Sequence, residues 1–371
     1  MSAILDLKKR LQASCKGSHI SILSESDIAT IKTFFPTPSL DLNRILTGSL
    51  FKGLASRTLT LMVGPEASFK SSFMCLCAAE AQKQGYTPLI IDTEGAWTAD
   101  FVERWGLDST NMIYMYEPMI EKILVMLGQL IDGNDQKLCI IVDSIGGLES
   151  QKLVDDAVDG EVKADQGGLA RKIKRMLKLI LRVCKGQDSL ALASAHMYGA
   201  PGSYGPSEEI GGGKFVKLAP DTIIGLKKHK IIDKDKNVIG NSITATTLKN
   251  RLYPPFSEAT IDINYIDGIN RLAGMVDLCI EAGFIEKGGA WFTNTLTGQK
   301  YQGEANAFKA VDEEMLKKLD EWLQKTGYST VNNAIAEAAA ILEITDEIPT
   351  DEEIEDVSST GKKLRSMSKG E

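Results

Sequence analysis

Between Thr58 and Ala195, continuous apolar runs alternate with stretches of helical periodicity, and this alternation constrains the fold more than any other feature. The apolar runs are Thr58–Val63, Pro88–Asp92, Leu138–Asp143 and Leu190–Ala195. The helical stretches follow Lys70 and cover Asp100–Trp105, Glu121–Ile131 and Gly168–Lys185. Strands without a polar face belong inside a parallel sheet that helices cover on both sides. The pattern therefore predicts an α/β core built on a twisted, mainly parallel sheet.

Later segments extend this core. Three further apolar runs follow one another without helices, as in an antiparallel extension of a sheet: Thr222–Leu226, Ser242–Leu248 and Ala259–Asn264. Two stretches, Leu153–Gly167 and Met197–Lys214, lack periodicity, and connections longer than about 12–15 residues are usually functional or disordered. From Ala273 to Tyr328 the pattern is helical with a short strand-like insert at Trp291, which predicts a small C-terminal domain.

The composition excludes several classes of protein. Hydrophobic residues make up 43% of the chain and charged residues 25%, as in globular proteins. No run approaches the ~18–20 apolar residues of a membrane helix, and residues 1–11 lack the apolar centre of a secretory signal. The six cysteines are scattered without disulfide-framework or zinc-site spacing, so we expect a cytoplasmic protein with reduced thiols.

The net charge of −8 argues at first against a nucleic-acid partner. Residues 343–371, however, hold nine acidic and four basic side chains, so this segment contributes −5 and the rest of the chain only −3. The segment is also polar and without apolar periodicity, which predicts a disordered acidic tail. Basic groups elsewhere can therefore still gather on one face.

A loop able to hold phosphate follows the first apolar run. Its residues are Gly64, Pro65, Glu66, Ala67, Ser68, Phe69, Lys70 and Ser71. Backbone N–H groups at the following helix start would hold phosphate oxygens, Lys70 would neutralise the terminal phosphates, and Ser71 would place its hydroxyl on Mg²⁺. We therefore predict binding and hydrolysis of a nucleoside triphosphate, taken as ATP with Mg²⁺. An ordinary strand-to-helix turn with an exposed lysine is the alternative.

Polar side chains also end the other apolar runs. Asp143 ends the third run and could hold Mg²⁺ through water, with helix capping as the alternative. Glu94 follows the second run and is our candidate general base for the attacking water. Because the carboxyl ends of parallel strands meet at one edge, we expect Lys70, Glu94 and Asp143 in one crevice. His196 ends the fourth run, where it is either a γ-phosphate sensor or a hydrogen-bonded surface residue.

The helical stretch from Gly168 to Lys185 has an apolar side and a basic side. The basic side carries Arg171, Lys174, Arg175, Lys178, Arg182 and Lys185 without an interleaved acid. Such a row is the footprint expected for a nucleic-acid backbone, and a solvated charged face is the alternative. In the glycine-rich stretch that follows, Tyr198, Tyr204 and Phe215 could stack on single-stranded bases.

In their order and spacing, these residues resemble the RecA-type homologous recombinases over about residues 35–310. The matching segments are Gly64–Ser71, Ile91–Glu94, Val142–Ser144, Gly168–Arg171, Gly211–Lys214, Gly268–Asn270, Gly289–Trp291 and Gly303–Ala307. The resemblance implies a RecA-like phosphate-loop ATPase core that assembles with ATP into a head-to-tail helical filament on single-stranded DNA. It further implies a search for homology and strand exchange with double-stranded DNA.

The resemblance also implies roles for single residues. Phe101 stands where the family stacks an aromatic ring on adenine, and His196 stands where bacterial members have a glutamine that reports the γ-phosphate. Lys249 and Arg251 match two cations that reach ATP on the neighbouring subunit. The remaining nucleotide-binding residues are Gly64 to Ser71 with Ser72 and Asp143, and the second DNA-binding loop includes Gly211, Gly212, Gly213 and Lys214.

Four segments follow from the resemblance. Residues 1–34 would form an N-terminal polymerisation segment, in which Ile4, Leu7 and Leu11 lie at helical spacing and dock on the adjacent core. Residues 35–272 would form the ATPase core with the DNA-binding loops, and residues 273–342 a small α+β domain. Residues 343–371 would be the acidic tail.

Two departures from the bacterial pattern resemble the UvsX recombinases of T-even bacteriophages. Phe69 replaces a glycine, although a left-handed backbone costs a bulky residue roughly 1–2 kcal/mol, and His196 replaces a glutamine. A phage-encoded member would work in the cytoplasm of a bacterial host, beside a recombination mediator and a single-stranded-DNA-binding protein. A ring-forming helicase or another DNA-stimulated ATPase on the same core is the alternative function.

Overall fold

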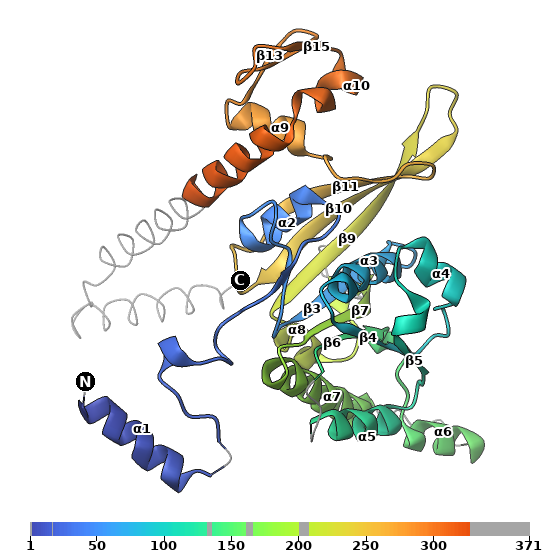
Figure 1. The fold of residues 1–371 in the computed structure, drawn as a ribbon. Helices are drawn as coiled ribbons and strands as arrows, with labels where there is room; N and C mark the ends of the chain where they lie inside the picture. Colours follow the sequence, from blue (N-terminus) through green and yellow to red (C-terminus); the bar gives the residue numbers. More distant parts are fainter. Residues whose placement is uncertain (1, 17, 132–135, 161–165, 200–207, 327–371) are drawn as a thin grey trace, which may run out of the picture. The chain divides into compact units, whose positions relative to one another are not determined.

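The computed structural model describes residues 2–16, 18–131, 136–160, 166–199 and 208–326 (Figure 1). The chain divides into two units, residues 1–321 and residues 322–371. Of the second unit, only residues 322–326 are described, and they are helical. The first unit is built on a sheet with the strand order β12-β11-β10-β9-β3-β7-β6-β4-β5, and β8 pairs with β7.

The four predicted strands form the parallel centre of this sheet. They are β3 (Leu59–Gly64), β4 (Thr87–Asp92), β6 (Leu138–Asp143) and β7 (Leu190–Gly199). The sheet ends on one side at β5 (Ile113–Tyr116), a parallel strand that the sequence analysis missed. Its side chains are largely exposed, so this strand lacks the continuous apolar run that identifies its buried neighbours.

The predicted antiparallel extension is confirmed and is longer than expected. It consists of β9 (Thr222–Ile232), β10 (Val238–Asn250), β11 (Glu258–Asn264) and β12 (Gly268–Asn270). Strand β9 runs parallel to β3 and antiparallel to β10, so it joins the two halves of the sheet. The outer part of β9 is largely exposed and the ends of β10 are only partly buried, which explains why the apolar runs were shorter than the strands.

Two apolar layers cover the two faces of the sheet (Figure 1). One layer contains α2 (Leu40–Thr47) and α3 (Lys70–Lys83), which pack on strand residues such as Ile90 and Ile141. The other contains α5 (Ile120–Ile131) and α7 (Gln166–Gly186), which pack on Ile91 and Ile140. Successive strand residues thus face opposite layers, as a sheet buried on both sides requires.

Shorter elements complete the first unit. At its start lie α1 (Ser2–Ser14), η1 (Leu23–Glu25) and the strand pair β1 (Phe34–Phe35) and β2 (Leu54–Ala55). Between the strands lie α4 (Ala99–Arg104), η2 (Ser109–Asn111), η3 (Ile145–Gly147) and α8 (Lys214–Leu218). No helix among the described residues is long and apolar enough to cross a membrane.

The region after Ala273 combines helices with a small sheet. The helices are α9 (Met275–Glu281), α10 (Glu304–Ala307), η4 (Phe308–Ala310) and a further one that begins at residue 313 and is described to residue 326. The expected insert at Trp291 is a three-stranded antiparallel sheet of β13 (Ile285–Gly288), β14 (Trp291–Asn294) and β15 (Lys300–Gln302). An α+β architecture is therefore present here, and residues 327–371, with the predicted acidic tail, lie outside the described chain.

Both stretches without periodicity contain regular structure, so that expectation was partly wrong. Leu153–Val158 belongs to α6 (Gln151–Val158), which has no fully buried side chain among those described. Its apolar residues do recur at helical spacing, and the sequence analysis overlooked that short pattern. Met197 to Gly199 extend β7, which pairs antiparallel with β8 (Glu208–Ile210).

A buried carboxylate ties the start of β7 to the rest of the core. Asp188 accepts hydrogen bonds from Lys137 Nζ at 3.0 Å and Ser56 Oγ at 2.9 Å. Arg57 Nε lies 3.0 Å from Asp188 Oδ1 as an ion pair, although it is not aligned as a hydrogen bond. Burial favours a raised pKa for Asp188, but the bonds from Lys137 and Ser56 and the charge of Arg57 outweigh it and lower the pKa.

Replacing Asp188 with Asn should lower the free energy of unfolding by about 2 kcal/mol at pH 7, the range of a buried hydrogen bond to a charged group. Because the folded-state pKa is lowered, the contribution of Asp188 exists above its unfolded pKa near 4 and is lost as the pH falls through the folded value. Urea unfolding at pH 7 and at pH 3 measures this. Asp27→Asn, which removes an exposed ion pair with Lys32, is the control and should leave the midpoint unchanged. An Asp188→Asn midpoint equal to wild type at pH 7 would contradict the assignment.

Candidate active site

The loop between β3 and α3 surrounds a buried ammonium group. Lys70 is only 7% exposed, and its Nζ donates to Pro65 O at 2.7 Å, Gly64 O at 3.1 Å and Ser68 Oγ at 3.4 Å. Burial lowers the pKa of Lys70, and the charges of Asp143 and Glu94 partly oppose that shift. A desolvated cation at the first turn of a 14-residue helix is suited to bind an anion such as a phosphate group.

Phe69 adopts the left-handed conformation that glycine usually provides. Its φ is +78° and its ψ is 10°, and it forms the N-cap of α3. The aromatic ring packs edge to face against Trp105, with ring centroids 5.2 Å apart, and contacts the apolar layer below. Such a ring pair contributes about 0.5–1.5 kcal/mol beyond area burial, which offsets most of the backbone cost of roughly 1–2 kcal/mol.

Two carboxylates extend from neighbouring strands toward this loop. Strands β4 and β6 pair in parallel, with Asp92 opposite Asp143, and Glu94 lies two residues beyond β4. Asp143 is 6% exposed and accepts a hydrogen bond from Trp97 Nε1 at 2.8 Å and another from Ser194 Oγ. Its position is therefore fixed from both sides.

Glu94 is held by groups from two other strands. Ser144 Oγ donates to Glu94 Oε1 at 2.5 Å, and His196 Nε2 lies 3.8 Å from the same oxygen. Glu94 is nevertheless half-exposed, which leaves the carboxylate accessible to water and to a ligand. A positioned carboxylate beside a phosphate loop can accept a proton from an attacking water molecule.

A cavity of about 290 Å³ collects these side chains. Its predicted lining residues are Glu66, Ala67, Ser68, Phe69, Lys70, Ser71, Ser72, Glu94, Asp143 and His196. Gly64 and Pro65 contribute the carbonyl oxygens that bind Lys70. The expected crevice at the carboxyl edge of the parallel strands is therefore present, and its lining includes one histidine, three acids and two lysines.

Four further lining residues were missed from sequence: Ser144, Ser194, Lys228 and Asn241. Ser194 precedes His196 by two positions on β7, so strand alternation could have placed it on the same face. Lys228 and Asn241 come from β9 and β10, and only the pairing of β9 with β3 brings them to this cavity. No local sequence signal reports that pairing.

The residues present fit ATP with Mg²⁺. Among the described residues no cluster of three or more His, Cys, Asp or Glu could hold a metal alone. Ser71 and Asp143 line the same cavity beside Lys70, so a hydroxyl and a carboxylate stand where a phosphate-bound Mg²⁺ needs oxygen ligands. Phe101 lies on α4, half-buried, with its ring 5.5 Å from that of Trp97 and outside the cavity lining.

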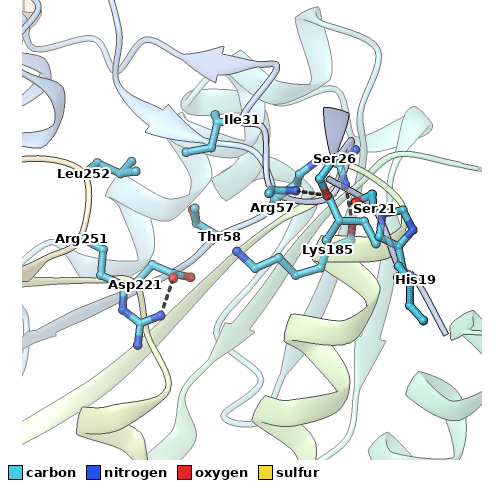
Figure 2. Close-up of a pocket in the computed structure, with 13 residues that line it drawn as sticks. His19, Ser21, Ser26, Ile31, Arg57, Thr58, Lys185, Asp221, Arg251 and Leu252 are labelled. Carbon is cyan, nitrogen blue, oxygen red and sulfur yellow. Dashed lines mark hydrogen bonds and ion pairs between the residues drawn. The ribbon is translucent and has the colours of Figure 1, made fainter. Parts of the chain in front are cut away.

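Lys249 and Arg251 do not join this cavity. Arg251 N donates to Asp221 O and Asp221 N donates to Leu59 O, so Arg251 is level with the first residue of β3. The phosphate loop follows the last residue of β3, roughly 16 Å away along the strand. In Figure 2, Arg251 points toward Asp221, and the two side chains form an ion pair of 3.1 Å.

Lys249 is also held at this second location. Its Nζ donates to Leu218 O at 2.8 Å and Lys217 O at 3.3 Å, at the end of α8. Burial and the charge of Arg251 lower the pKa of Lys249, while Asp221 opposes that shift. A single subunit therefore keeps these two cations at the end of the strands opposite to Lys70.

Helix α7 has the two sides that the sequence predicts. Ile173, Met176, Leu177, Ile180 and Cys184 are buried against the sheet. Arg171, Lys174, Arg175, Lys178 and Arg182 are exposed, and Lys185 is half-buried. The ammonium groups of Lys174 and Lys178 lie 5.4 Å and 5.9 Å from the ring centre of Phe215 on α8. Phe215 is thus packed on the basic helix rather than extended from a loop.

The base of the glycine-rich segment is closely packed. Gly212 has φ +92°, and a Cβ atom there would lie 2.9 Å from side-chain carbons of Ile145 and Val216. Gly213 has φ +90° and Lys214 begins α8. Gly211 N donates to His196 O at 3.3 Å, which joins this base to the cavity. Tyr198 belongs to β7, while Tyr204 lies outside the described residues.

A phosphate loop at the carboxyl edge of a parallel sheet, with acids on the adjacent strand ends, defines the class of phosphate-loop nucleoside triphosphatases. The family model for the RecA N-terminal domain matches residues 3–270. The chain belongs to the RecA family and is a RecA-type DNA recombinase, which implies a DNA-dependent ATPase activity. Proteins of this family generally use ATP with Mg²⁺.

Three relatives of this chain support its membership of the RecA family. Protein RecA of Oleidesulfovibrio alaskensis is 30% identical over 276 residues, which cover 73% of this chain and 76% of the relative. Protein RecA of Chlorobaculum tepidum is 29% identical over 266 residues, or 71% and 75%. Protein RecA of Chloroherpeton thalassium is 28% identical over 271 residues, or 72% and 74%.

Substitutions at Phe69 should separate backbone cost from packing. Phe69→Ala loses the ring contacts and keeps the left-handed conformation, whereas Phe69→Gly loses the same contacts and removes the strain. We expect Phe69→Gly to be more stable than Phe69→Ala by about 1 kcal/mol. Denaturant unfolding of the two variants measures the difference. An alanine variant as stable as the glycine variant would show that the loop backbone is not strained at this position.

Proposed function

We propose that this chain assembles with ATP into a helical filament on single-stranded DNA and catalyses homologous pairing and strand exchange. The observation that carries the proposal is the position of His196. Its ring lies 3.8 Å from Glu94 at the nucleotide cavity, and its carbonyl oxygen accepts the hydrogen bond from Gly211 at the base of the glycine-rich segment. One residue therefore contacts both the hydrolytic site and the proposed second DNA-binding loop.

In the proposed hydrolytic step, Glu94 orients the attacking water and accepts its proton. Lys70 holds the terminal phosphates, while Ser71 and Asp143 orient the metal ion. Phe101 is assigned to the adenine. When bound, ATP would supply the phosphoryl group and Mg²⁺ would neutralise part of the phosphate charge. His196 responds to the occupied cavity through Glu94 and moves Gly211. The affinity for DNA therefore depends on which nucleotide is bound.

Assembly would place ATP between two subunits. Lys70 and its loop bind from one subunit, and Lys249 and Arg251 reach the same nucleotide from the next. Because these groups lie at opposite ends of the strands, one subunit cannot supply both, and the resulting head-to-tail contact builds an open filament. Helix α1 supports this arrangement, because Ile4, Leu7 and Leu11 are exposed apolar side chains without a buried position in the chain.

The DNA would lie along the exposed basic side of α7. Arg171, Lys174 and Arg175 supply phosphate contacts, and Gly211 to Lys214 form the base of the second DNA-binding loop. Phe215 transmits loop position to Lys174 and Lys178, and Tyr198 and Tyr204 stack on bases. The acidic residues 343–371 compete with DNA for this basic side, and residues 273–342 form the separate small domain.

The finer assignment is a recombinase of the UvsX type, encoded by a T-even-like phage and active in recombination, repair and recombination-dependent replication in the bacterial cytoplasm. Phe69 and His196, which depart from the bacterial pattern, support it. Expected partners are a recombination mediator and a single-stranded-DNA-binding protein. A ring helicase on the same core remains the alternative, and it differs by directional unwinding from a closed hexamer.

ATP hydrolysis should rise at least tenfold when single-stranded DNA is added, because the DNA-bound loop completes the site through His196. Lys70→Ala should lose nucleotide binding and turnover together. Glu94→Gln should bind ATP and DNA normally and lose about 10²-fold to 10³-fold in kcat, the range of a lost general base with its electrostatic support. Phosphate release with and without DNA measures all three.

These variants separate the claims. Hydrolysis that is indifferent to DNA would contradict the recombinase function. Turnover retained in Glu94→Gln would contradict only the role of Glu94 and would leave the DNA-dependent assembly intact.

A further inference from the structure

One fully buried acid near the cavity has no role in the account above. Asp92 is 0% exposed at the end of β4, and four donors converge on its carboxylate. Its Oδ1 accepts from Glu94 N at 3.0 Å and Gly95 N at 2.8 Å, and its Oδ2 accepts from Trp97 N and Tyr114 OH, each at 3.0 Å. Every partner except Tyr114 belongs to the loop that carries Glu94.

The same loop also fixes the second acid of the cavity. The backbone N–H of Trp97 donates to Asp92 Oδ2, and its indole Nε1–H donates to Asp143 Oδ2 at 2.8 Å. Glu94 and Asp143 therefore both depend on one loop conformation. That conformation requires an acceptor with two oxygen atoms, because three backbone N–H groups and one hydroxyl point at it.

We propose that Asp92 is the positioning residue of this ATPase: it orients Glu94 and Asp143 through the loop from Thr93 to Trp97, without touching the nucleotide. This inference rests on the proposed hydrolytic role of Glu94. An asparagine has one oxygen and one NH₂ group, so it can accept from only one pair of donors and directs its own donor at the other pair. The loop then loses either the bonds at Glu94 and Gly95 or the bond at Trp97.

Tyr114 connects this acid to the edge of the sheet. It lies on β5, the last strand, and is the only donor to the Asp92 side chain that comes from outside the loop among the described residues. Burial and the hydrogen bond to Asp92 raise the pKa of Tyr114, so the hydroxyl keeps its proton. Removing this hydroxyl takes away one of four bonds and leaves the loop donors in place.

Tyr116 offers a matched control on the same strand. It is 59% exposed and lies two residues after Tyr114 on the same face of β5. Among the described residues, its hydroxyl makes no hydrogen bond to Asp92, in contrast to that of Tyr114. Tyr116→Phe and Tyr114→Phe remove the same atom from neighbouring exposed tyrosines, and only Tyr114 donates to Asp92.

The test compares DNA-dependent ATP hydrolysis in the full chain. Asp92→Asn should lower kcat about 10²-fold, the effect of a catalytic group displaced by about 1 Å, while KM for ATP and DNA binding stay within about twofold of wild type. Tyr114→Phe should lower kcat about fivefold, corresponding to one net hydrogen bond, and Tyr116→Phe should not change it. Asp92→Asn combined with Glu94→Gln should lose less than the product of the two single losses, because part of the effect of Asp92 passes through Glu94.

Each result bears on the proposal. A wild-type kcat in Asp92→Asn, equal rates in the two tyrosine variants, or single losses that multiply fully in the double variant would overturn it. If Asp92→Asn fails to fold, the comparison of kcat between Tyr114→Phe and Tyr116→Phe tests the proposal on its own. Full turnover in Glu94→Gln would contradict the hydrolytic role of Glu94. An inactive Glu94→Gln together with an active Asp92→Asn would contradict only the positioning role of Asp92, so the two failures are distinguishable.

Discussion

The burial of the sheet on both faces is the constraint on which the rest of the structure depends. The helices that bury these faces also connect β3, β4, β6 and β7 by crossovers, so the four strands run parallel and their carboxyl ends meet at one edge. That edge collects Lys70, Glu94 and Asp143 around one cavity. The opposite end of the same strands carries Arg251. A subunit with an anion site at one end and cations at the other is complementary to a copy of itself, which favours repeated head-to-tail contact over a closed pair.

The cavity is organised by hydroxyl, indole and imidazole groups that lie against its acids. Ser144 and His196 bracket Glu94, while Trp97 and Ser194 hold Asp143. Lys70 remains desolvated among carbonyl oxygens, and its lowered pKa reflects a cation that a phosphate group would stabilise. The carbonyl oxygen of His196 accepts a hydrogen bond from Gly211 N, which connects the cavity to the glycine-rich segment. This continuity supports the proposed coupling of nucleotide state to DNA binding, because strand β7 joins the cavity to the base of the glycine-rich segment.

The sequence predicted those parts of the molecule that follow from burial. The parallel strands, α3, α5 and α7 each bury a face, and the phosphate loop and the two acids occur at strand ends. Strand β5 was missed because its side chains are largely exposed, and helix α6 was missed although its few apolar residues recur at helical spacing. Lys228 and Asn241 were missed because they reach the cavity only through the pairing of β9 with β3. The strain at Phe69 was foreseen as a cost, but its compensation by Trp105 depends on a contact between different helices.

The central claim is that one nucleotide is shared by two subunits, and mixing two inactive variants tests it most directly. Lys70→Ala lacks the phosphate-loop cation, and the double variant Lys249→Ala with Arg251→Ala lacks the cations from the neighbour. In an equal mixture on single-stranded DNA, about a quarter of the interfaces combine an intact loop with intact cations. The account predicts that DNA-dependent ATP hydrolysis recovers to about that fraction of the wild-type rate. A mixture as inactive as the separate variants would contradict a shared site.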